Sequence, residues 1–246
     1  MNIAILSGKG GTGKTLLAVN LAAVANGASY IDCDVEEPNG HLFFKPDSLE
    51  VEAVTVKIPQ ISDDLCDGCL HCVEFCKFNA LAYPNKLMIF DDICHSCGGC
   101  VLLCPQKALT ERDKAIGEIR TGKSKDVDVV TGIMNSGVAS GVPIIDELQK
   151  HIQQKSKEEK HVFIDCPPGS SCVVMDSIKN ADYCILVAEP SIFGVHNLEM
   201  VHELVELFEK DYGVVLNKVQ TGENPAEDYC LANDINILGS ILFDPE

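Results

Sequence analysis

Cysteine is the residue type that stands out most in this sequence. Of its 13 cysteines, eight fall into two blocks that share the spacing C-x2-C-x2-C-x3-C. The blocks are Cys66, Cys69, Cys72 and Cys76, and then Cys94, Cys97, Cys100 and Cys104. Gaps this short let one tight loop aim several thiolates at a single metal centre, and thiolates bind both iron–sulfur clusters and zinc. Zinc ribbons usually place their cysteine pairs farther apart, so the spacing favours iron–sulfur clusters, with zinc as the alternative.

The duplicated block resembles the bacterial two-cluster ferredoxins. In that family three close cysteines hold one cubane, and the fourth cysteine of the same block holds the other. The resemblance implies one [4Fe-4S] cluster on Cys66, Cys69, Cys72 and Cys104, and a second on Cys94, Cys97, Cys100 and Cys76.

A glycine-rich segment is the second feature that could do chemistry. Residues 8–15 read G-K-G-G-T-G-K-T, between a predicted strand at 2–6 and a predicted helix at 16–26. This is the phosphate-binding G-x4-G-K-T pattern in the strand, loop and helix context that it requires, whereas a glycine-rich turn without a ligand is the alternative. We expect Lys14 on the β- and γ-phosphates and Thr15 on Mg²⁺. The expected nucleotide contacts are Gly8, Lys9, Gly10, Gly11, Thr12, Gly13, Lys14, Thr15 and Leu16.

Lys9, directly after the first glycine, makes this loop resemble that of the MinD/ParA and nitrogenase-iron-protein ATPases. In those proteins a lysine at this position reaches the nucleotide of the partner subunit, which implies an ATP-dependent homodimer. The resemblance assigns catalytic roles to Lys9, Lys14 and Asp34, of which Asp34 orients the attacking water. It assigns the magnesium site to Thr15, Asp34 and Asp165, with Asp165 in the second coordination shell.

Three later segments resemble further parts of these ATPases. Pro167, Pro168 and Gly169 match switch II. Asn217 and Lys218 follow a predicted strand and resemble the segment that recognises adenine. Glu189 either lines the adenine pocket or only shapes a turn.

The whole chain is similar to MinD-superfamily ATPases that contain an inserted ferredoxin domain. This implies a discontinuous P-loop ATPase domain at 1–57 and 113–246, and an inserted α+β ferredoxin domain at 58–112. Short apolar runs also alternate with amphipathic stretches such as 198–208. That alternation predicts an α/β fold with a mostly parallel sheet and helices on both of its faces.

Composition excludes several classes of partner. The 246 residues include 19 Lys and Arg but 37 Asp and Glu, which gives a formal net charge of −18. Nucleic-acid binding depends on clustered basic residues, so we expect no such partner. No run approaches the roughly 20 apolar residues of a membrane span, and no export signal begins the chain. We therefore expect a cytoplasmic protein with reduced thiols and no stable membrane insertion.

The expected function is a magnesium-dependent ATPase that is slow without a partner and acts as a nucleotide-driven dimer switch. Coupled to two [4Fe-4S] clusters, it would transfer electrons to, or assemble metal clusters on, an unidentified redox or metallocluster partner. The alternative is a MinD/ParA-like positioning or partitioning ATPase whose clusters are structural or redox-sensing. The chain ends at Phe243-Asp244-Pro245-Glu246 without the basic amphipathic helix of MinD, which weakens this alternative. A third class, a binding module that nucleotide only stabilises, is disfavoured by the intact Lys14 and Asp165.

Cys172 is the one remaining cysteine with a possible metal role. It lies seven residues after Asp165, the offset at which the nitrogenase iron protein places one of its two cluster ligands. The other ligand has no counterpart, because residues 132–141 contain no cysteine. A dimer would thus offer two thiolates at its axis, fewer than the four of a cubane. A bridging thiol and a small residue at a helix start both remain possible interpretations.

Overall fold

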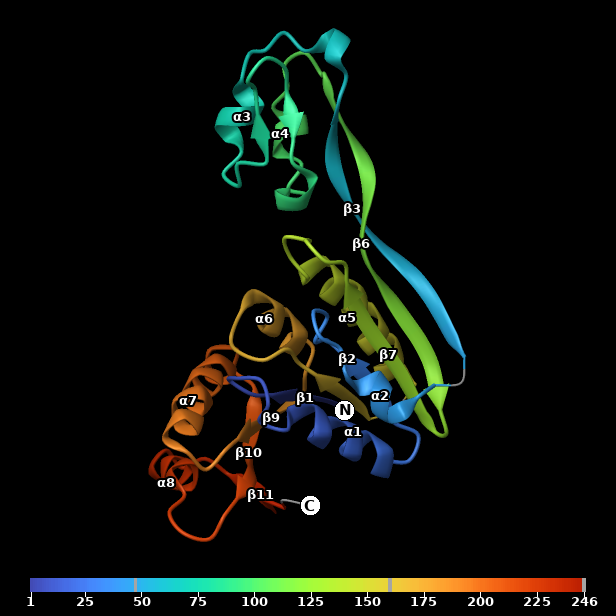
Figure 1. Cartoon of the computed structure of the whole chain (residues 1–246). Coiled ribbons are helices and arrows are strands. Elements are labelled where there is room, and N and C mark those ends of the chain that lie inside the picture. The colour runs from blue at the N-terminus through green and yellow to red at the C-terminus, as the bar shows by residue number, and fades with distance from the viewer. Residues whose placement is uncertain (47, 159–160, 245–246) are drawn as a thin grey trace.

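The structure, a computed structural model, describes residues 1–46, 48–158 and 161–244. Within these residues nine strands form one sheet, in the order β11-β10-β9-β1-β8-β2-β7-β6-β3 (Figure 1). They are β1 (Asn2–Leu6), β2 (Ser29–Asp32), β3 (Leu49–Ile61), β6 (Leu109–Ser124), β7 (Val127–Met134), β8 (Val162–Asp165), β9 (Tyr183–Ala188), β10 (Asp211–Val219) and β11 (Ile237–Leu242). From β11 to β7 the strands run parallel, whereas β6 and β3 are antiparallel additions. The expected α/β fold with a mostly parallel sheet is confirmed.

The central strands are short apolar runs because both of their faces are covered. All four residues of β2 and of β8 are buried. Successive side chains of a strand point to opposite faces. In β1, accordingly, Ala4 and Leu6 join the core on one face and Ile5 joins the core on the other. Short, continuous apolar runs therefore predict parallel strands, although they do not give the order of the strands in the sheet.

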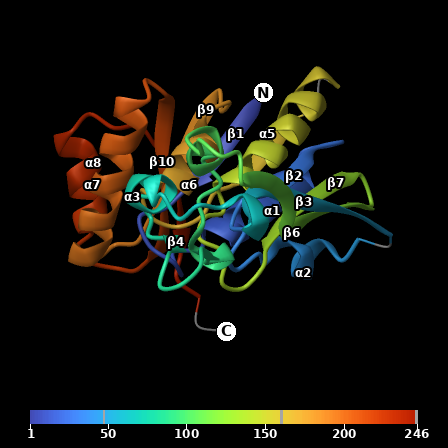
Figure 2. The same ribbon diagram turned by 90° about the horizontal axis from the view of Figure 1, so that it is seen from above.

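Helices cover both faces of the sheet (Figures 1 and 2). On one face lie α1 (Lys14–Val24) and α2 (Gly40–Phe44), and α1 buries Ala18, Val19 and Ala22 there. On the other face lie α5 (Val142–Lys157), α6 (Cys172–Ile178), α7 (Ile192–Leu207) and α8 (Pro225–Ala232). The predicted helix at 16–26 thus begins earlier, at Lys14, so that its first turn directly follows the glycine-rich loop.

The strands β3 and β6 form a ribbon that projects out of the sheet (Figure 1). β6 pairs with β7 only from Gly117 to Ser124, but its pairing with β3 continues outward to Leu109, opposite Ile61. A register shift lies between Val54 and Thr55, close to the point where β6 leaves β7. The sequence analysis did not predict this ribbon, because antiparallel pairing of distant segments has no local signature. It also missed β7, which follows β6 through the short turn at Lys125-Asp126.

Residues 62–108, called the cysteine segment below, sit at the far end of this ribbon (Figure 1). They contain the two 3-10 turns Asp63–Leu65 and Asp91–Ile93, the helices α3 (His71–Phe75) and α4 (Gly99–Leu102), and the strands β4 (Leu81–Ala82) and β5 (Met88–Ile89). β4 and β5 form a separate two-stranded sheet. A small core of its own buries Leu81 and Leu87 together with Cys100. Viewed from above, the segment lies over the body of the chain (Figure 2).

Two ion pairs connect the cysteine segment to the ribbon. Arg112 of β6 pairs with Asp91, and Lys114 Nζ lies 2.8 Å from Asp92 Oδ1. The boundaries expected at 58 and 112 fall inside β3 and β6, so the chain enters and leaves the segment through two paired strands.

No helix in the described parts of the chain has the length and apolar character that crossing a bilayer requires. Pro245 and Glu246, the last residues of the ending considered above, lie outside the described residues.

Candidate functional site

The glycine-rich loop joins β1 to α1 and borders a cavity of about 290 Å³. Its backbone has positive φ at Gly11 (80°) and Gly13 (94°), a conformation that glycine adopts without strain. Gly13 is also the N-cap of α1, and the free N–H groups of a first helical turn attract anions. The lining residues are Ser7, Lys9, Gly10, Gly11, Thr12, Gly13, Lys14, Thr15, Leu16, Asp34, Glu37, Asn39 and Pro168.

The lining differs from the predicted contacts at a few positions. Ser7, Glu37 and Asn39 face the cavity although the sequence analysis did not single them out. Gly8 is not among the lining residues, and a Cβ at this position would lie 2.1 Å from the backbone oxygen of Asn197. The absence of a side chain at Gly8 therefore allows the loop to pass close to α7.

Lys14 forms a buried ion pair with Asp165. The distance from Lys14 Nζ to Asp165 Oδ1 is 2.7 Å, and the two side chains are 6% and 1% exposed. Burial by itself would lower the pKa of Lys14, but the Asp165 carboxylate outweighs this effect and raises that pKa. Lys14 is therefore charged, and its ammonium group is held at the floor of the loop.

Tyr30, a residue that the sequence analysis did not assign to the site, also binds Asp165. Its hydroxyl donates a hydrogen bond of 2.8 Å to Asp165 Oδ2, and the Tyr30 side chain is fully buried. Burial, together with the carboxylates of Asp32 and Asp165, raises the pKa of Tyr30 well above its ordinary value. Both carboxylate oxygens of Asp165 are thus engaged by buried donors.

Asp32 and Asp34 follow each other closely but have different surroundings. Asp34 faces the cavity, whereas Asp32 is fully buried and accepts hydrogen bonds from the backbone N–H groups of Asp34 (3.2 Å) and Gly40 (3.0 Å). Burial and the nearby Asp165 charge raise the pKa of Asp32 to about 7. Burial also raises the pKa of Asp34, against the opposing effect of Lys14. Asp32 therefore fixes both ends of the 34–40 segment, a role that two aspartates after an apolar strand could have suggested.

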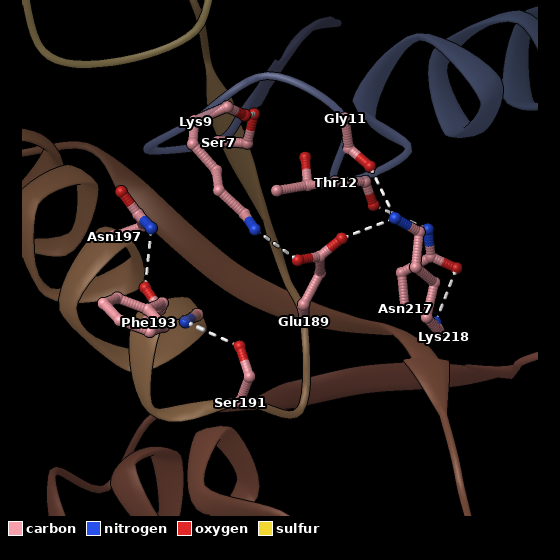
Figure 3. Close-up of polar contacts among 11 residues, drawn as sticks. Ser7, Lys9, Gly11, Thr12, Glu189, Ser191, Phe193, Asn197, Asn217 and Lys218 are labelled. Carbon is pink, nitrogen blue, oxygen red and sulfur yellow. Dashed lines mark hydrogen bonds and ion pairs between the residues drawn. The ribbon is translucent and has the colours of Figure 1, made fainter.

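Lys9 extends from the loop to Glu189, which directly follows β9 (Figure 3). Lys9 Nζ lies 2.6 Å from Glu189 Oε2, and Lys218 Nζ lies 2.5 Å from Glu189 Oε1. Lys218 Nζ also donates to the backbone oxygen of Gly11 at 2.7 Å. Burial would raise the pKa of Glu189, but hydrogen bonds from Lys218 and Lys9 hold it below its ordinary value. One carboxylate thus bridges two lysines at the mouth of the loop.

Asn217 contacts the loop itself. Its Nδ2 donates to the backbone oxygen of Thr12 at 2.6 Å (Figure 3). A neighbouring cavity of about 300 Å³ is lined by Glu189, Pro190, Ser191, Lys218, Gln220, Thr221, Glu223 and Phe243. The structure therefore brings Glu189 and Lys218 to this cavity, whereas Asn217 supports the loop from β10.

The segment predicted as switch II lies against the loop and Asp34. The backbone N–H of Gly169 donates to the oxygen of Ser7 at 2.9 Å. Gly169 has a positive φ of 93°, so the turn favours glycine. Pro167 and Pro168 line a cavity of about 180 Å³ together with Asp34.

The eight repeated cysteines line two cavities, and each cavity takes its fourth cysteine from the other block. Cys66, Cys69, Cys72 and Cys104 line a narrow cavity of about 20 Å³. Cys76, Cys94, Cys97 and Cys100 line a cavity of about 280 Å³. In the described residues, no group of three or more His, Cys, Asp and Glu side chains is placed to hold a single metal ion.

The two cysteine blocks have the same local geometry. The backbone N–H of Ala80 donates to Cys76 Sγ at 3.3 Å, and that of Ala108 donates to Cys104 Sγ at 3.3 Å. Each block also enters its short helix through a residue with positive φ, Leu70 in the first and Gly98 in the second. The repeat in the sequence is therefore a repeat in structure.

The other five cysteines are separate from these cavities. Cys33, Cys166, Cys184 and Cys230 are buried. Burial raises the pKa of Cys184 to about 12 and that of Cys230 to about 11, so these thiols are neutral core residues. Cys172 is exposed and begins α6.

Comparisons with known proteins agree with the fold and the loop. A family model described as the CobQ/CobB/MinD/ParA nucleotide binding domain matches residues 3–246. An uncharacterised protein of Methanocaldococcus jannaschii is 34% identical over 222 residues, which cover 89% of this chain and 78% of that protein.

Two solved structures are similar over almost the whole chain. The cell division ATPase MinD of Pyrococcus furiosus has a TM-score of 0.59 and 20% identity, and the match covers 99% of this chain and 84% of that one. The septum site-determining protein MinD of Pyrococcus horikoshii, complexed with Mg-ADP, has a TM-score of 0.56 and 20% identity, with coverages of 99% and 82%.

Proposed function

The chain belongs to the CobQ/CobB/MinD/ParA nucleotide-binding family, and we propose that its ATPase cycle is a dimer switch coupled to two [4Fe-4S] clusters in the cysteine segment. The protein is a P-loop ATPase of this family. In the proposal, ATP binding and hydrolysis change the protein environment of the clusters. They thereby control electron transfer to, or cluster assembly on, a partner protein.

The observation that carries the cluster proposal is the exchange of the fourth cysteine between the two cavities. Cys104 joins the first block and Cys76 joins the second, which is the ligand exchange typical of two-cluster ferredoxins. A single zinc ion requires four ligands that converge on one point, and within the described residues no group of three or more His, Cys, Asp and Glu side chains does so. Around the narrower cavity a bound cluster would need the thiols to move apart.

The donor set fits a cluster chemically as well. In each set all four candidate ligands are thiols, and backbone N–H groups point at the sulfur atoms of Cys76 and Cys104. Such hydrogen bonds stabilise thiolate charge and tune the potential of a cluster. A bound [4Fe-4S] cluster would supply one-electron chemistry at low potential.

The lining of the loop cavity supports the ATPase part of the proposal. Lys14, Thr15 and Asp34 line the same cavity, where Lys14 would neutralise the β- and γ-phosphates and Thr15 and Asp34 would hold Mg²⁺ and the attacking water. Asp165 lies behind Lys14 and would act on the magnesium shell through water. Lys14 is paired with Asp165, so in this proposal the phosphates of ATP compete with that carboxylate for the Lys14 ammonium group.

Lys9 supports the dimer in this proposal. In the single chain it is paired with Glu189, and its side chain is 39% exposed at the mouth of the loop. A lysine in this position can turn from its own Glu189 to the nucleotide of a second copy. ATP would then favour dimerisation because it offers the stronger anionic partner.

A second candidate function is positioning or partitioning, as in MinD. It is favoured by the similarity of the whole fold to the cell division ATPase of Pyrococcus furiosus. In that case the clusters would be structural or redox-sensing, and ATP would drive dimerisation alone. The two functions differ in whether nucleotide changes the properties of the clusters.

The experiment that tests the proposal begins with iron and sulfide analysis of protein purified without oxygen. We expect about eight iron atoms per chain, four for each cubane. Cys104→Ser should remove one cluster. Cys172→Ala tests the bridging thiol separately, because an iron content equal to that of the parent removes that interpretation. Zinc in place of iron would contradict the proposal.

A second measurement separates the two candidate functions. The reduction potentials of the clusters are compared without nucleotide, with ADP and with a non-hydrolysable ATP analogue. A shift with nucleotide supports coupling. Equal potentials in the three states would favour the positioning ATPase.

A further inference from the structure

The magnesium aspartate of the proposed site is in contact with a tyrosine from a neighbouring strand. Tyr30 lies on β2 and Asp165 ends β8, and these strands pair in parallel with Tyr30 opposite Phe163 and Asp32 opposite Asp165. The Tyr30 hydroxyl is 2.8 Å from Asp165 Oδ2, on the carboxylate oxygen that Lys14 leaves free. The contact is fully buried, so water cannot replace the hydroxyl.

The same hydroxyl lies against the segment that carries Asp34. A Cβ added at Gly40 would be 2.1 Å from the Tyr30 hydroxyl oxygen, so the backbone of Gly40 packs directly on that group. The N–H of Gly40 is held by Asp32 Oδ2 at 3.0 Å, and Asp32 Oδ1 accepts from Asp34 N–H. A continuous chain of contacts therefore runs from Asp165 through Tyr30 and Gly40 to the segment that begins at Asp34.

The ring of Tyr30 is fixed independently of its hydroxyl. It packs on Phe44 of α2, with the ring centroids 5.1 Å apart. Because the ring sits between β2 and α2, the hydroxyl has little freedom to turn away from Asp165. Loss of the oxygen alone would leave the ring in place but would leave Asp165 Oδ2 as a buried carboxylate oxygen without this donor.

We propose that Tyr30 is a positioning residue of the ATPase site, which orients the Asp165 carboxylate towards Lys14 and the magnesium site and links that orientation to the Asp34 segment. The inference rests on the role proposed for Asp165 above. Tyr30 itself touches neither the loop cavity nor the nucleotide in this arrangement. It acts through Asp165 and through the backbone at Gly40.

The test is the effect of Mg²⁺ on nucleotide affinity in Tyr30→Phe, measured with a fluorescent ADP analogue in EDTA and in Mg²⁺. The variant should bind nucleotide normally in EDTA, because Lys14 and the loop are intact. The gain in affinity upon adding Mg²⁺ should fall by about tenfold, the order expected for one lost hydrogen bond to a charged group. An equal gain in the variant and the parent overturns the proposal.

Tyr212→Phe is the matched control. Tyr212 also uses its hydroxyl in the fold, with His202 Nε2 2.7 Å away, but this contact involves α7 and β10 and not the Asp165 site. Its loss should leave the Mg²⁺ effect unchanged. If the parent protein itself shows no Mg²⁺ effect, the role proposed for Asp165 fails first, which separates the two ideas.

A spectroscopic measurement that keeps Tyr30 covers the case in which Tyr30→Phe does not fold. The sequence holds five tyrosines, so 3-fluorotyrosine labelling gives five signals. The Tyr30 signal is the one that persists when the other four tyrosines are replaced in turn. It should shift when Mg²⁺ is added to the nucleotide-bound protein, and a signal that stays unmoved overturns the proposal.

Discussion

Lys9 and Glu189 form an ion pair within one chain, with 2.6 Å between Nζ and Oε2. The same carboxylate holds Lys218, which in turn binds the backbone of the glycine-rich loop. Before Lys9 can reach a partner's nucleotide it must leave Glu189. The ion pair with Glu189 therefore competes with the proposed dimer for Lys9.

Glu189→Gln should strengthen the ATP-dependent dimer. A partly exposed ion pair contributes about 0.2–1 kcal/mol, and a symmetric dimer releases two of them, so the dissociation constant of the dimer should fall by up to about thirtyfold. Sedimentation at a saturating concentration of a non-hydrolysable ATP analogue measures this constant. Glu199→Gln on α7, near the exposed His196, is the control and should change nothing. A dimer that is weaker or unchanged in Glu189→Gln would refute the competition between Glu189 and the nucleotide.

Lys14→Ala should abolish ATP binding and also destabilise the nucleotide-free fold. The substitution leaves the Asp165 carboxylate buried without its cation, which costs about 3–5 kcal/mol for a buried pair of this kind. Urea unfolding measures the loss, and titration calorimetry measures ATP binding. Adding Asp165→Asn should recover part of the stability but none of the binding. If the double variant is as unstable as Lys14→Ala, the unpaired charge is not the cause.

Asp32 should make the fold less stable as the pH rises. Its pKa is about 7 in the folded chain, above the ordinary value of 3.8, so the folded state holds the proton to higher pH than the unfolded state does. The folded state then binds more protons between pH 4 and 7, and the free energy of unfolding falls with pH in that range by up to about 1.4 kcal/mol per unit. Above about pH 7 the contribution of Asp32 to the free energy of unfolding no longer changes with pH.

Comparison with Asp32→Asn isolates this contribution from the other acidic groups. Urea unfolding of both proteins at several values between pH 5.5 and 8 gives the difference in free energy. The stability of the parent relative to the variant should decline up to about pH 7 and then level off. A difference that does not change with pH would show that Asp32 does not titrate in this range and would contradict the raised pKa.

Gly13→Ala should remove nucleotide binding by disturbing the support of the loop. A Cβ at this position would lie 2.1 Å from Asn217 Nδ2, the group that donates to Thr12, and the backbone has a φ of 94°. Gly27→Ala is the control, because Gly27 also has positive φ (68°) but open space around it. Both variants should lose about 1 kcal/mol from backbone strain, whereas only Gly13→Ala should lose ATP binding. Equal binding by the two variants would mean that the contact with Asn217 is dispensable.

Local patterns predicted the elements that depend on neighbouring residues alone. The glycine-rich loop between an apolar strand and a helix is encoded in fewer than 20 residues, and the structure has it between β1 and α1. Periods of apolar residues likewise predicted a mostly parallel sheet, which is confirmed. By contrast, the ribbon of β3 and β6 was not predicted, because its pairing joins residues up to 73 positions apart and leaves no short-range period. β7 was missed as well, although it follows β6 through the short turn at Lys125-Asp126.

The sequence by itself determined the chemistry that is available: two repeated blocks of thiols, a phosphate-binding loop and the acidic residues that follow buried strands. Only the tertiary structure decided which of these groups meet. Parallel pairing of β2 with β8 brings Tyr30 close to Asp165, and the return of the chain after β9 brings Glu189 to Lys9. Residue types fix charge and hydrogen-bonding capacity locally. The burial that raises the pKa of Asp32 and the ion pair that holds Lys9 arise only when distant strands pack together.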